Sequence, residues 1–226
     1  MTGRALLVAH RAGNDPRSAR AAAQAGADLV EADVHLRRGR LELRHPRRIG
    51  PVLWDREGVA LVRGAPQGPE PALAALGPTA EPLLDLKGGP PRLAEAALAA
   101  ARAALGDRPV TIASRRWDLL ERVVGAPGVR IVRSAASRRE VERLLRLART
   151  GRLGDGASVR ADLLGPGVAA ALREAAPFLA SWPVGGPDEA ERLTGAGVTA
   201  LIVDDLALLA RLAAPVSAGL ERPGPA

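Results

Sequence analysis

The sequence predicts a single α/β domain folded as a TIM (β/α)8 barrel. Eight short apolar segments of strand length recur along the chain, and segments with helical periodicity separate them. Such alternation calls for parallel strands joined by right-handed crossovers, and eight of them close most simply into a barrel. An open, doubly wound sheet is the alternative. The expected strands span residues 5–9, 29–34, 83–86, 110–113, 129–132, 157–161, 178–181 and 200–203.

The intervening segments carry helix signals. Residues 137–148 place apolar side chains at positions i, i+3, i+4 and i+7, beginning with Val141, and Gly151 follows as a stop. Other helices are expected to open on a proline, which is favoured in the first turn because its missing N–H is not needed there. These prolines are Pro16, Pro91, Pro166 and Pro187. We expect the barrel to occupy residues 1–214, and residues 215–226, which have little apolar content, to form a disordered tail.

Composition limits the compartment and the chemistry. A chain of 226 residues with 47% hydrophobic content can bury a substantial core. The lack of cysteine excludes disulfides, thiolate metal sites and a thiol nucleophile, and it fits a reducing compartment. The apolar run at residues 5–9 is too short for a signal peptide, and no run approaches the roughly 18 residues of a membrane span. We therefore expect a cytoplasmic protein without stable membrane insertion.

The basic balance of the chain does not indicate a nucleic-acid partner. The net charge is +7, but the basic residues are scattered among acidic ones and aromatic residues make up only 2%. Nucleic-acid binders gather basic residues and present aromatic side chains for base stacking. Lys87 is the only lysine, since every other residue of the Lys+Arg pool is arginine. Because the planar guanidinium cannot replace a compact ammonium in a tight site, Lys87 is a candidate for chemistry.

The candidate functional residues follow the first three strands. In a barrel, functional groups lie at the carboxyl ends of the strands, and residues two apart on a strand point to the same side. These residues are His10 and Arg11, then Glu31 and Asp33, then Asp85 and Lys87. Residues 40–44 read as an extra short strand after a turn at Arg38 and Gly39, which would return His45 over the barrel mouth.

Further polar residues lie near the expected mouth. Ser114 follows the fourth strand and either contacts the ligand or ends the strand. Trp182 is either core or part of a substrate wall. Asp204 and Asp205 are expected to cap the last helix.

Two other residues lie close to the metal and histidine candidates. Asn14, the only asparagine, either assists at the site or caps a helix. His35 is expected to be a loop histidine.

At these residues the chain resembles a known family. The segments AHR, GADLVEADVHLRRGRLELRH, LLDLK, TIAS, SWPV and GAGVTALIVDD occur in the order found in the glycerophosphodiester phosphodiesterases. The resemblance implies a TIM barrel in which His10 and His45 are the acid/base pair. It also implies a divalent cation bound by Glu31, Asp33 and Asp85. Arg11 and Lys87 would contact the phosphate, with Lys87 also catalytic, and Trp182 would line the substrate site.

The chemistry of these residues agrees with the implied reaction. Three converging carboxylates are unstable without a cation, and hard oxygen ligands without cysteine favour Mg²⁺ or Ca²⁺ over zinc. Two histidines can accept and donate the protons needed to cleave a phosphodiester near neutral pH. We therefore expect metal-dependent hydrolysis of a small glycerophosphodiester to glycerol 3-phosphate and an alcohol. The attacking group is either water or a neighbouring substrate hydroxyl.

Several positions depart from the family pattern. Ala12 stands where glycine is usual, Pro46 where aspartate follows the second histidine, and Gly185 where asparagine follows the tryptophan. Asp85 replaces the usual glutamate, as in the related sphingomyelinase and phospholipase D branch. Residues 46–82 are short for a substrate-covering insertion, which suggests an open mouth with Trp54 near its rim.

These departures leave two alternative functions open. The first is a phospholipase D-like enzyme acting on lysophospholipid or sphingolipid headgroups, which a wide mouth with Trp54 would favour. The second is a catalytically silent barrel that binds phosphorylated ligands. The sequence does not indicate the alcohol group of the substrate, the native cation or the oligomeric state.

Overall fold

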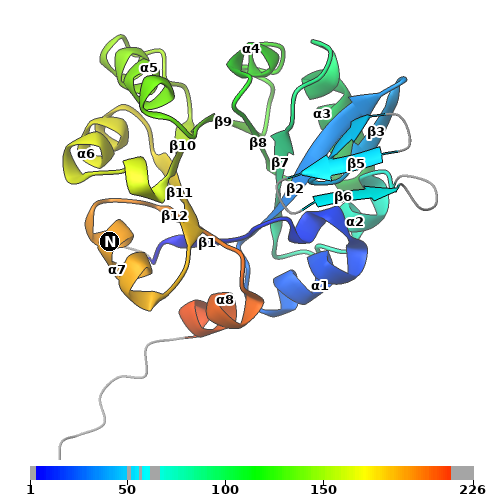
Figure 1. Ribbon diagram of the computed structural model, residues 1–226, viewed down its shortest axis with the longest axis horizontal. Coiled ribbons are helices and arrows are strands. Elements are labelled where there is room, and N and C mark those ends of the chain that lie inside the picture. The colour runs from blue at the N-terminus through cyan, green and yellow to red at the C-terminus, as the bar shows by residue number, and fades with distance from the viewer. Residues whose placement is uncertain (1–3, 50–51, 56–57, 62–66, 215–226) are drawn as a thin grey trace, which may run out of the picture.

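Eight parallel strands form a closed ring with helices packed around it in the computed structural model, which describes residues 4–49, 52–55, 58–61 and 67–214 (Figure 1). β1 pairs with both β12 and β2, which closes the barrel. The barrel strands are β1 (Leu6–Ala9), β2 (Leu29–Arg37), β7 (Glu81–Leu86), β8 (Val110–Ser114), β9 (Val129–Ala135), β10 (Gly156–Arg160), β11 (Phe178–Val184) and β12 (Ala200–Val203). The predicted TIM barrel and its strands are confirmed. The predicted tail at residues 215–226 lies outside the described residues.

The helices begin largely where the sequence signals them. They are α1 (Pro16–Gln24), α2 (Glu70–Ala74), α3 (Leu93–Leu105), α4 (Trp117–Leu120), α5 (Arg138–Arg149), α6 (Pro166–Ala175), α7 (Pro187–Gly195) and α8 (Leu206–Ala213), with short 3-10 turns η1 (Ala12–Asn14) and η2 (Ala161–Leu163). Three helices open on the predicted prolines, whereas α3 begins two residues after Pro91. Ser137 caps α5 by accepting a hydrogen bond from the Glu140 N–H. Side-chain caps of this kind also mark the first turns of α1, capped by Asp15, and α8, capped by Asp205.

Alternation along the strands divides the hydrophobic core into two parts. One set of side chains fills the barrel and includes Val8, Leu29, Leu83, Val132 and Ile202, which are all buried. The other set packs between the barrel and the helices, with Leu7, Val30 and Leu201 among its members. Successive side chains of a strand point to opposite faces. Residues that lie two or four positions after a member of the inner set therefore also point into the barrel, near the carboxyl ends of its strands.

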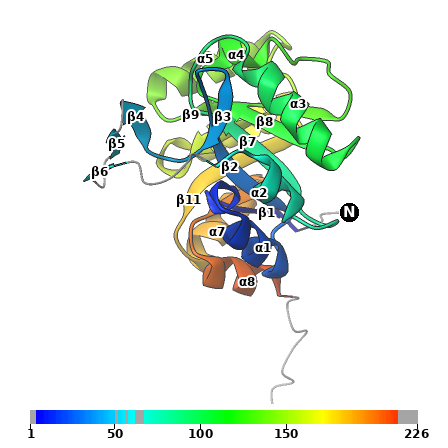
Figure 2. The same cartoon turned by 90° about the vertical axis from the view of Figure 1, so that its right-hand side faces the viewer.

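A hairpin and a small sheet extend beyond the barrel. β3 (Arg40–Leu43) pairs antiparallel with the end of β2 through a turn at Arg38 and Gly39, both of positive φ, as the sequence predicts. β4 (Arg47–Ile49), β5 (Val52–Asp55) and β6 (Gly58–Leu61) then form a separate three-stranded antiparallel sheet. Figure 2 shows this sheet projecting on the side opposite the N-terminus. This sheet was not predicted, since its strands are only three or four residues long and lack a clear alternating pattern.

The loop after β1 packs tightly against β2. A Cβ atom added to Gly13 would lie 2.8 Å from the Ala32 Cβ and 2.8 Å from the Glu31 carbonyl oxygen. Such a separation forces backbone to move, so this close approach requires glycine. Among the described residues, no helix has both the length and the apolar character needed to cross a bilayer.

We expect opposite stability changes from two glycine substitutions. Gly13→Ala should lower the free energy of unfolding by about 2 kcal/mol, because the added methyl group meets backbone. Gly167→Ala, in α6 with open space around it, should raise it by about 0.5 kcal/mol. Urea denaturation followed by circular dichroism measures both. A stable Gly13→Ala protein would contradict the close packing of this loop.

Candidate active site

Three carboxylates converge at the carboxyl end of the barrel. Glu31 and Asp33 come from β2 and Asp85 from β7, where Asp85 is the register partner of Asp33. One ligand oxygen from each lies within 4.8 Å of the others. Glu31 and Asp33 are fully buried, whereas Asp85 is partly exposed. The structure thus brings together the three residues that the sequence singles out as cation ligands.

Glu31 is only half satisfied by the protein. Its Oε2 accepts a hydrogen bond of 2.6 Å from the backbone N–H of Arg11, which adopts a left-handed conformation. Its Oε1 is buried without a hydrogen-bond partner among the described residues. Burial, and then the negative charge of Asp33, raise the pKa of Glu31 well above its ordinary value. A buried carboxylate oxygen without a hydrogen-bond partner is costly to the folded protein.

Asp33 is the most fully paired carboxylate of the group. Its Oδ1 lies 2.6 Å from the Lys87 Nζ, and its Oδ2 accepts a 2.6 Å hydrogen bond from the Asn14 side chain. The Asp33 backbone N–H donates to the Asn14 Oδ1 at 2.7 Å. Burial alone would raise the pKa of Asp33, but the hydrogen bond with His45 and the charge of Lys87 outweigh it and lower that pKa. Asn14 therefore belongs to the site, while Asp15 caps α1.

Lys87 lies between two of the carboxylates. Its ammonium forms ion pairs with Asp33 and with Asp85. Burial would lower the pKa of Lys87, but the charges of Asp85, Glu31 and Asp33 outweigh it and raise that pKa. Lys87 therefore stays protonated and supplies a fixed positive charge at the mouth, as its uniqueness in the sequence suggested.

The two candidate histidines approach this group from different elements. His45 follows β3, and its Nδ1 lies 3.4 Å from the Asp33 Oδ2. His10 follows β1, and its Nδ1 forms a short contact with the Asp204 carboxylate. Burial lowers the pKa of His10 although Asp204 acts in the opposite direction. The Nδ1 contact leaves the Nε2 of His10 available for a ligand.

Sequence reasoning misassigned two residues near the site. Asp204 does not cap α8; Asp205 does, by accepting a hydrogen bond from the Ala207 N–H. Asp204 lies beside His10 because β12 and β1 are neighbours in the closed barrel, with Val203 opposite Ala9. His35 is not a loop residue but part of β2, on the same face as Asp33. The predicted closure of the barrel, which makes the first and last strands neighbours, could have indicated that Asp204 lies beside His10.

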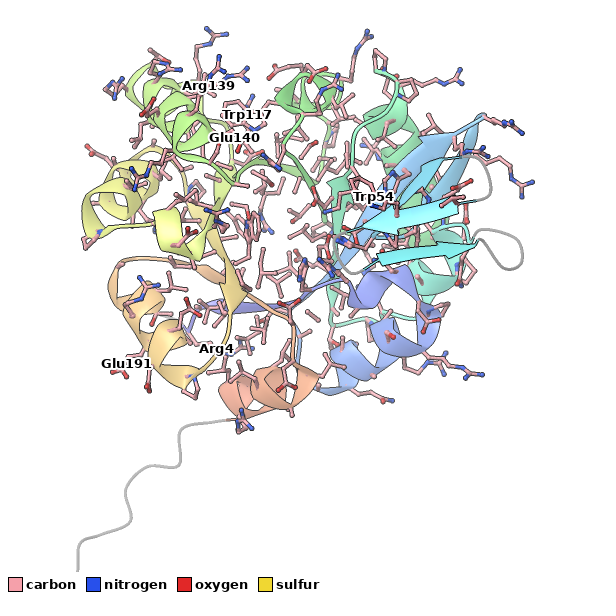
Figure 3. All side chains as sticks on the ribbon, in the orientation of Figure 1. Arg4, Trp54, Trp117, Arg139, Glu140 and Glu191 are labelled. Carbon is pink, nitrogen blue, oxygen red and sulfur yellow. The ribbon has the colours of Figure 1, made fainter. Side chains whose placement is uncertain are left out.

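The remaining candidates have more modest surroundings. The buried Ser114 hydroxyl donates to the Leu86 carbonyl oxygen and accepts from the Arg116 N–H, which makes its role structural. Trp182 is partly buried and packs on the apolar interior of the barrel. Trp54 lies on the small sheet, where its side chain is labelled in Figure 3, and is 49% exposed. The phosphate contact expected of the Arg11 side chain stays a prediction.

The donor set fits a hard divalent cation. The three carboxylates offer only oxygen ligands, and the unpartnered Glu31 Oε1 is the buried atom that a cation would satisfy. Oxygen-only donor sets of this kind suit Mg²⁺ and Ca²⁺. Glu31, Asp33 and Asp85 are therefore the residues that would hold it.

Several solved structures of phosphodiesterases superpose on this chain over most of its length. A phosphodiesterase from Oleispira antarctica, in complex with the product sn-glycerol-3-phosphate, superposes with a TM-score of 0.72 at 16% identity, over 92% of this chain and 94% of the other. The glycerophosphodiester phosphodiesterase of Thermotoga maritima gives 0.71 at 15% identity, over 94% and 100%. The chain has the fold of these enzymes.

A further solved structure agrees with this result. A glycerophosphodiester phosphodiesterase from Parabacteroides distasonis superposes with a TM-score of 0.68 at 18% identity, over 93% of this chain and 98% of the other. No protein-family model and no curated protein matches the sequence. The similarity that these structures show therefore lies in the fold.

Two substitutions on β2 should change stability in opposite directions. Glu31→Gln should raise the melting temperature of the metal-free protein increasingly as pH rises, because the raised pKa of Glu31 means that its ionised form destabilises the folded state and the amide cannot ionise. This gain should vanish in acid, where the carboxyl group is neutral. Asp33→Asn should lower the free energy of unfolding by about 3 kcal/mol, because Lys87 loses a buried partner.

Thermal denaturation with EDTA and with Mg²⁺ or Ca²⁺ measures these changes. Wild type should gain stability with the cation through preferential binding to the folded state, and Glu31→Gln should lose most of that gain. Destabilisation of the metal-free protein by Glu31→Gln would contradict the environment described for this carboxylate.

Proposed function

We propose that the protein is a metal-dependent phosphodiesterase that hydrolyses glycerophosphodiesters to glycerol 3-phosphate and an alcohol. The observation that carries the proposal is the convergence of Glu31, Asp33 and Asp85 beside Lys87 and two histidines. The fold shared with glycerophosphodiester phosphodiesterases supports it, as does the product held by the Oleispira antarctica structure. The cation is Mg²⁺ or Ca²⁺.

His10 is the proposed proton acceptor. Its lowered pKa keeps the imidazole neutral near pH 7, and Asp204 holds the Nδ1 side of the ring, so the Nε2 lone pair accepts the proton. The proton comes from the attacking oxygen, which belongs to water or to a neighbouring substrate hydroxyl. That oxygen forms a bond to phosphorus, and the bond from phosphorus to the leaving oxygen breaks.

His45 is the proposed proton donor to the leaving alkoxide. Its contact with Asp33 places the imidazole beside the three carboxylates. Lys87 keeps its positive charge and would stabilise the negative charge that grows on the phosphoryl oxygens. A cation held by the three carboxylates supplies Lewis-acid stabilisation of the same oxygens. Arg11 would contact the phosphate, and Trp182 would form a wall beside the alcohol.

One observation favours a lipid-like substrate as the second candidate function. Trp54 is 49% exposed on a small sheet that projects from the barrel. Exposed tryptophan is enriched where an apolar ligand meets water. A phospholipase D-like activity on lysophospholipids would use the same phosphate site with a longer apolar group beside Trp54.

Substitution of the proposed catalytic residues tests the function directly. Release of glycerol 3-phosphate from glycerophosphocholine is measured with Mg²⁺ or Ca²⁺. His10→Ala and His45→Ala should each lower kcat roughly 100-fold to 10,000-fold, as expected for loss of general acid–base catalysis. Lys87→Arg should also lose activity, because the wide guanidinium does not fit between the two carboxylates.

Arg192→Gln, on the exposed face of α7, is the control and should retain wild-type activity. Turnover of lysophosphatidylcholine without turnover of glycerophosphocholine would favour the second candidate. Lack of turnover of both would overturn the enzyme proposal and leave a barrel that binds phosphorylated ligands.

The pH profile separates the role of His10 from that of its partner. As pH falls, kcat/KM should decline through the pKa of His10, below its ordinary value of 6.5. Asp204→Asn removes the charge that raises this pKa, so the acid limb should move to lower pH. The maximal rate should fall roughly 10-fold to 100-fold, as for other orienting partners. A shift of the limb to higher pH would contradict the assignment.

A further inference from the structure

His45 reaches the site on an irregular segment between two strands. β3 ends at Leu43 and β4 begins at Arg47, so the barrel does not fix the His45 backbone. The His45 side chain is one-third exposed, and its Nδ1 contact with Asp33 is long, at 3.4 Å. A residue held so loosely needs support from its neighbours if its ring is to stay in one position.

Arg44 forms bonds on both sides of His45. Its backbone N–H donates to the Asp33 carbonyl oxygen at 3.1 Å, which ties the segment to β2. Its Nη1 donates to the Pro46 carbonyl oxygen in a short contact. The Arg44 side chain thereby links residue 44 to the Pro46 carbonyl oxygen, with His45 between them. This link restricts the conformation of the backbone from residue 44 to residue 46. His10, by contrast, follows directly from a barrel strand, and its backbone N–H donates to the Val203 carbonyl oxygen at 2.9 Å.

Glu42 fixes the guanidinium that makes this ring. The Arg44 Nε donates to the Glu42 Oε2 at 3.0 Å, and the two side chains are 14% and 6% exposed. An ion pair buried to this degree contributes little net stability but selects one arrangement of its groups. His35 is the register partner of Glu42 across the β2–β3 hairpin.

We propose that Arg44, held by Glu42, is the positioning residue for His45. The inference rests on the proposed function, since it assigns Arg44 an effect on catalysis through the proton donor. It also explains how the site tolerates Pro46, because the Pro46 carbonyl oxygen, rather than a side chain at that position, anchors the histidine segment. Arg44 acts through His45, since within the described residues its side chain bonds Glu42 and Pro46 and not Glu31, Asp33 or Asp85.

Histidine NMR tests the positioning without any need for activity. The chain contains three histidines, so their imidazole ring signals are resolvable and can be assigned by single substitutions. Arg44→Gln and Glu42→Gln should shift and broaden the His45 signal in the Mg²⁺-containing protein and leave the His10 signal unchanged. Arg40→Gln, at an exposed position of the same strand, is the matched control. An unchanged His45 signal in both variants would overturn the proposal.

Arg44→Lys and Glu42→Gln preserve size and serve where Arg44→Gln fails to fold. Lysine keeps the charge but cannot bond Glu42 and the Pro46 carbonyl oxygen together through two guanidinium nitrogens, so the His45 signal should still shift. An unshifted signal in a folded Arg44→Lys protein would count against the two-sided anchor.

A double-mutant cycle tests whether the effect on rate passes through His45. Arg44→Gln should lower kcat on glycerophosphocholine roughly 100-fold with little change in KM, as expected for a misplaced catalytic group. In the His45→Ala background the same substitution should cost less than about 3-fold, because the group it positions is already gone. Equal losses in both backgrounds would overturn the proposal. If His45→Ala alone leaves activity intact, the proposed role of His45 as proton donor fails, whereas lack of turnover by wild type overturns the proposed function; in both cases the NMR result still decides the positioning.

Discussion

The site depends on one electrostatic constraint, the close approach of three carboxylates at one end of a barrel. Glu31, Asp33 and Asp85 place ligand oxygens within 4.8 Å of one another, and Glu31 and Asp33 are buried. Like charges this close repel strongly in a low-dielectric environment, and each also loses its hydration. Positive charge must therefore be supplied, and the protein supplies part of it through Lys87.

The remaining charge imbalance is distributed unequally among the carboxylates. Asp33 contacts the ammonium of Lys87, the amide of Asn14 and the imidazole of His45. Glu31, by contrast, has one buried oxygen without a hydrogen-bond partner among the described residues. As a result, the pKa of Glu31 is raised and the pKa of Asp33 is lowered, although both residues lie on β2. Carboxylates with perturbed pKa values in a barrel mouth are typical of functional sites. A bound divalent cation would neutralise the excess negative charge of these carboxylates.

Much of this arrangement follows from local sequence patterns. Period-two spacing on apolar strands predicted that Glu31 and Asp33 share a face, as do Asp85 and Lys87, and the barrel brings both pairs to the same end. The closed barrel, its eight strands and the β2–β3 hairpin were also predicted correctly. These features depend on strand propensity and alternation, which short stretches of sequence carry.

The misassigned residues depend on contacts between distant parts of the chain. Asp204 has the local features of a helix cap, and only the neighbouring position of β12 and β1 places it against His10. Asn14 reads equally well as a cap until η1 is seen packed against β2. No sequence motif indicates the pairing of Glu42 with Arg44, because this pairing arises from burial of the hairpin. Such contacts are set by tertiary packing, which the local pattern does not encode.

The proposed role of the three carboxylates is to bind one cation beside the two histidines. A crystal structure of the protein soaked with Mn²⁺, a stand-in for Mg²⁺ that is visible by its anomalous scattering, can locate this cation. We expect a single strong anomalous peak within about 2.0–2.6 Å of oxygens from Glu31, Asp33 and Asp85, the range of hard-cation ligand distances. No peak at that position, or a peak held by other residues, would contradict this role.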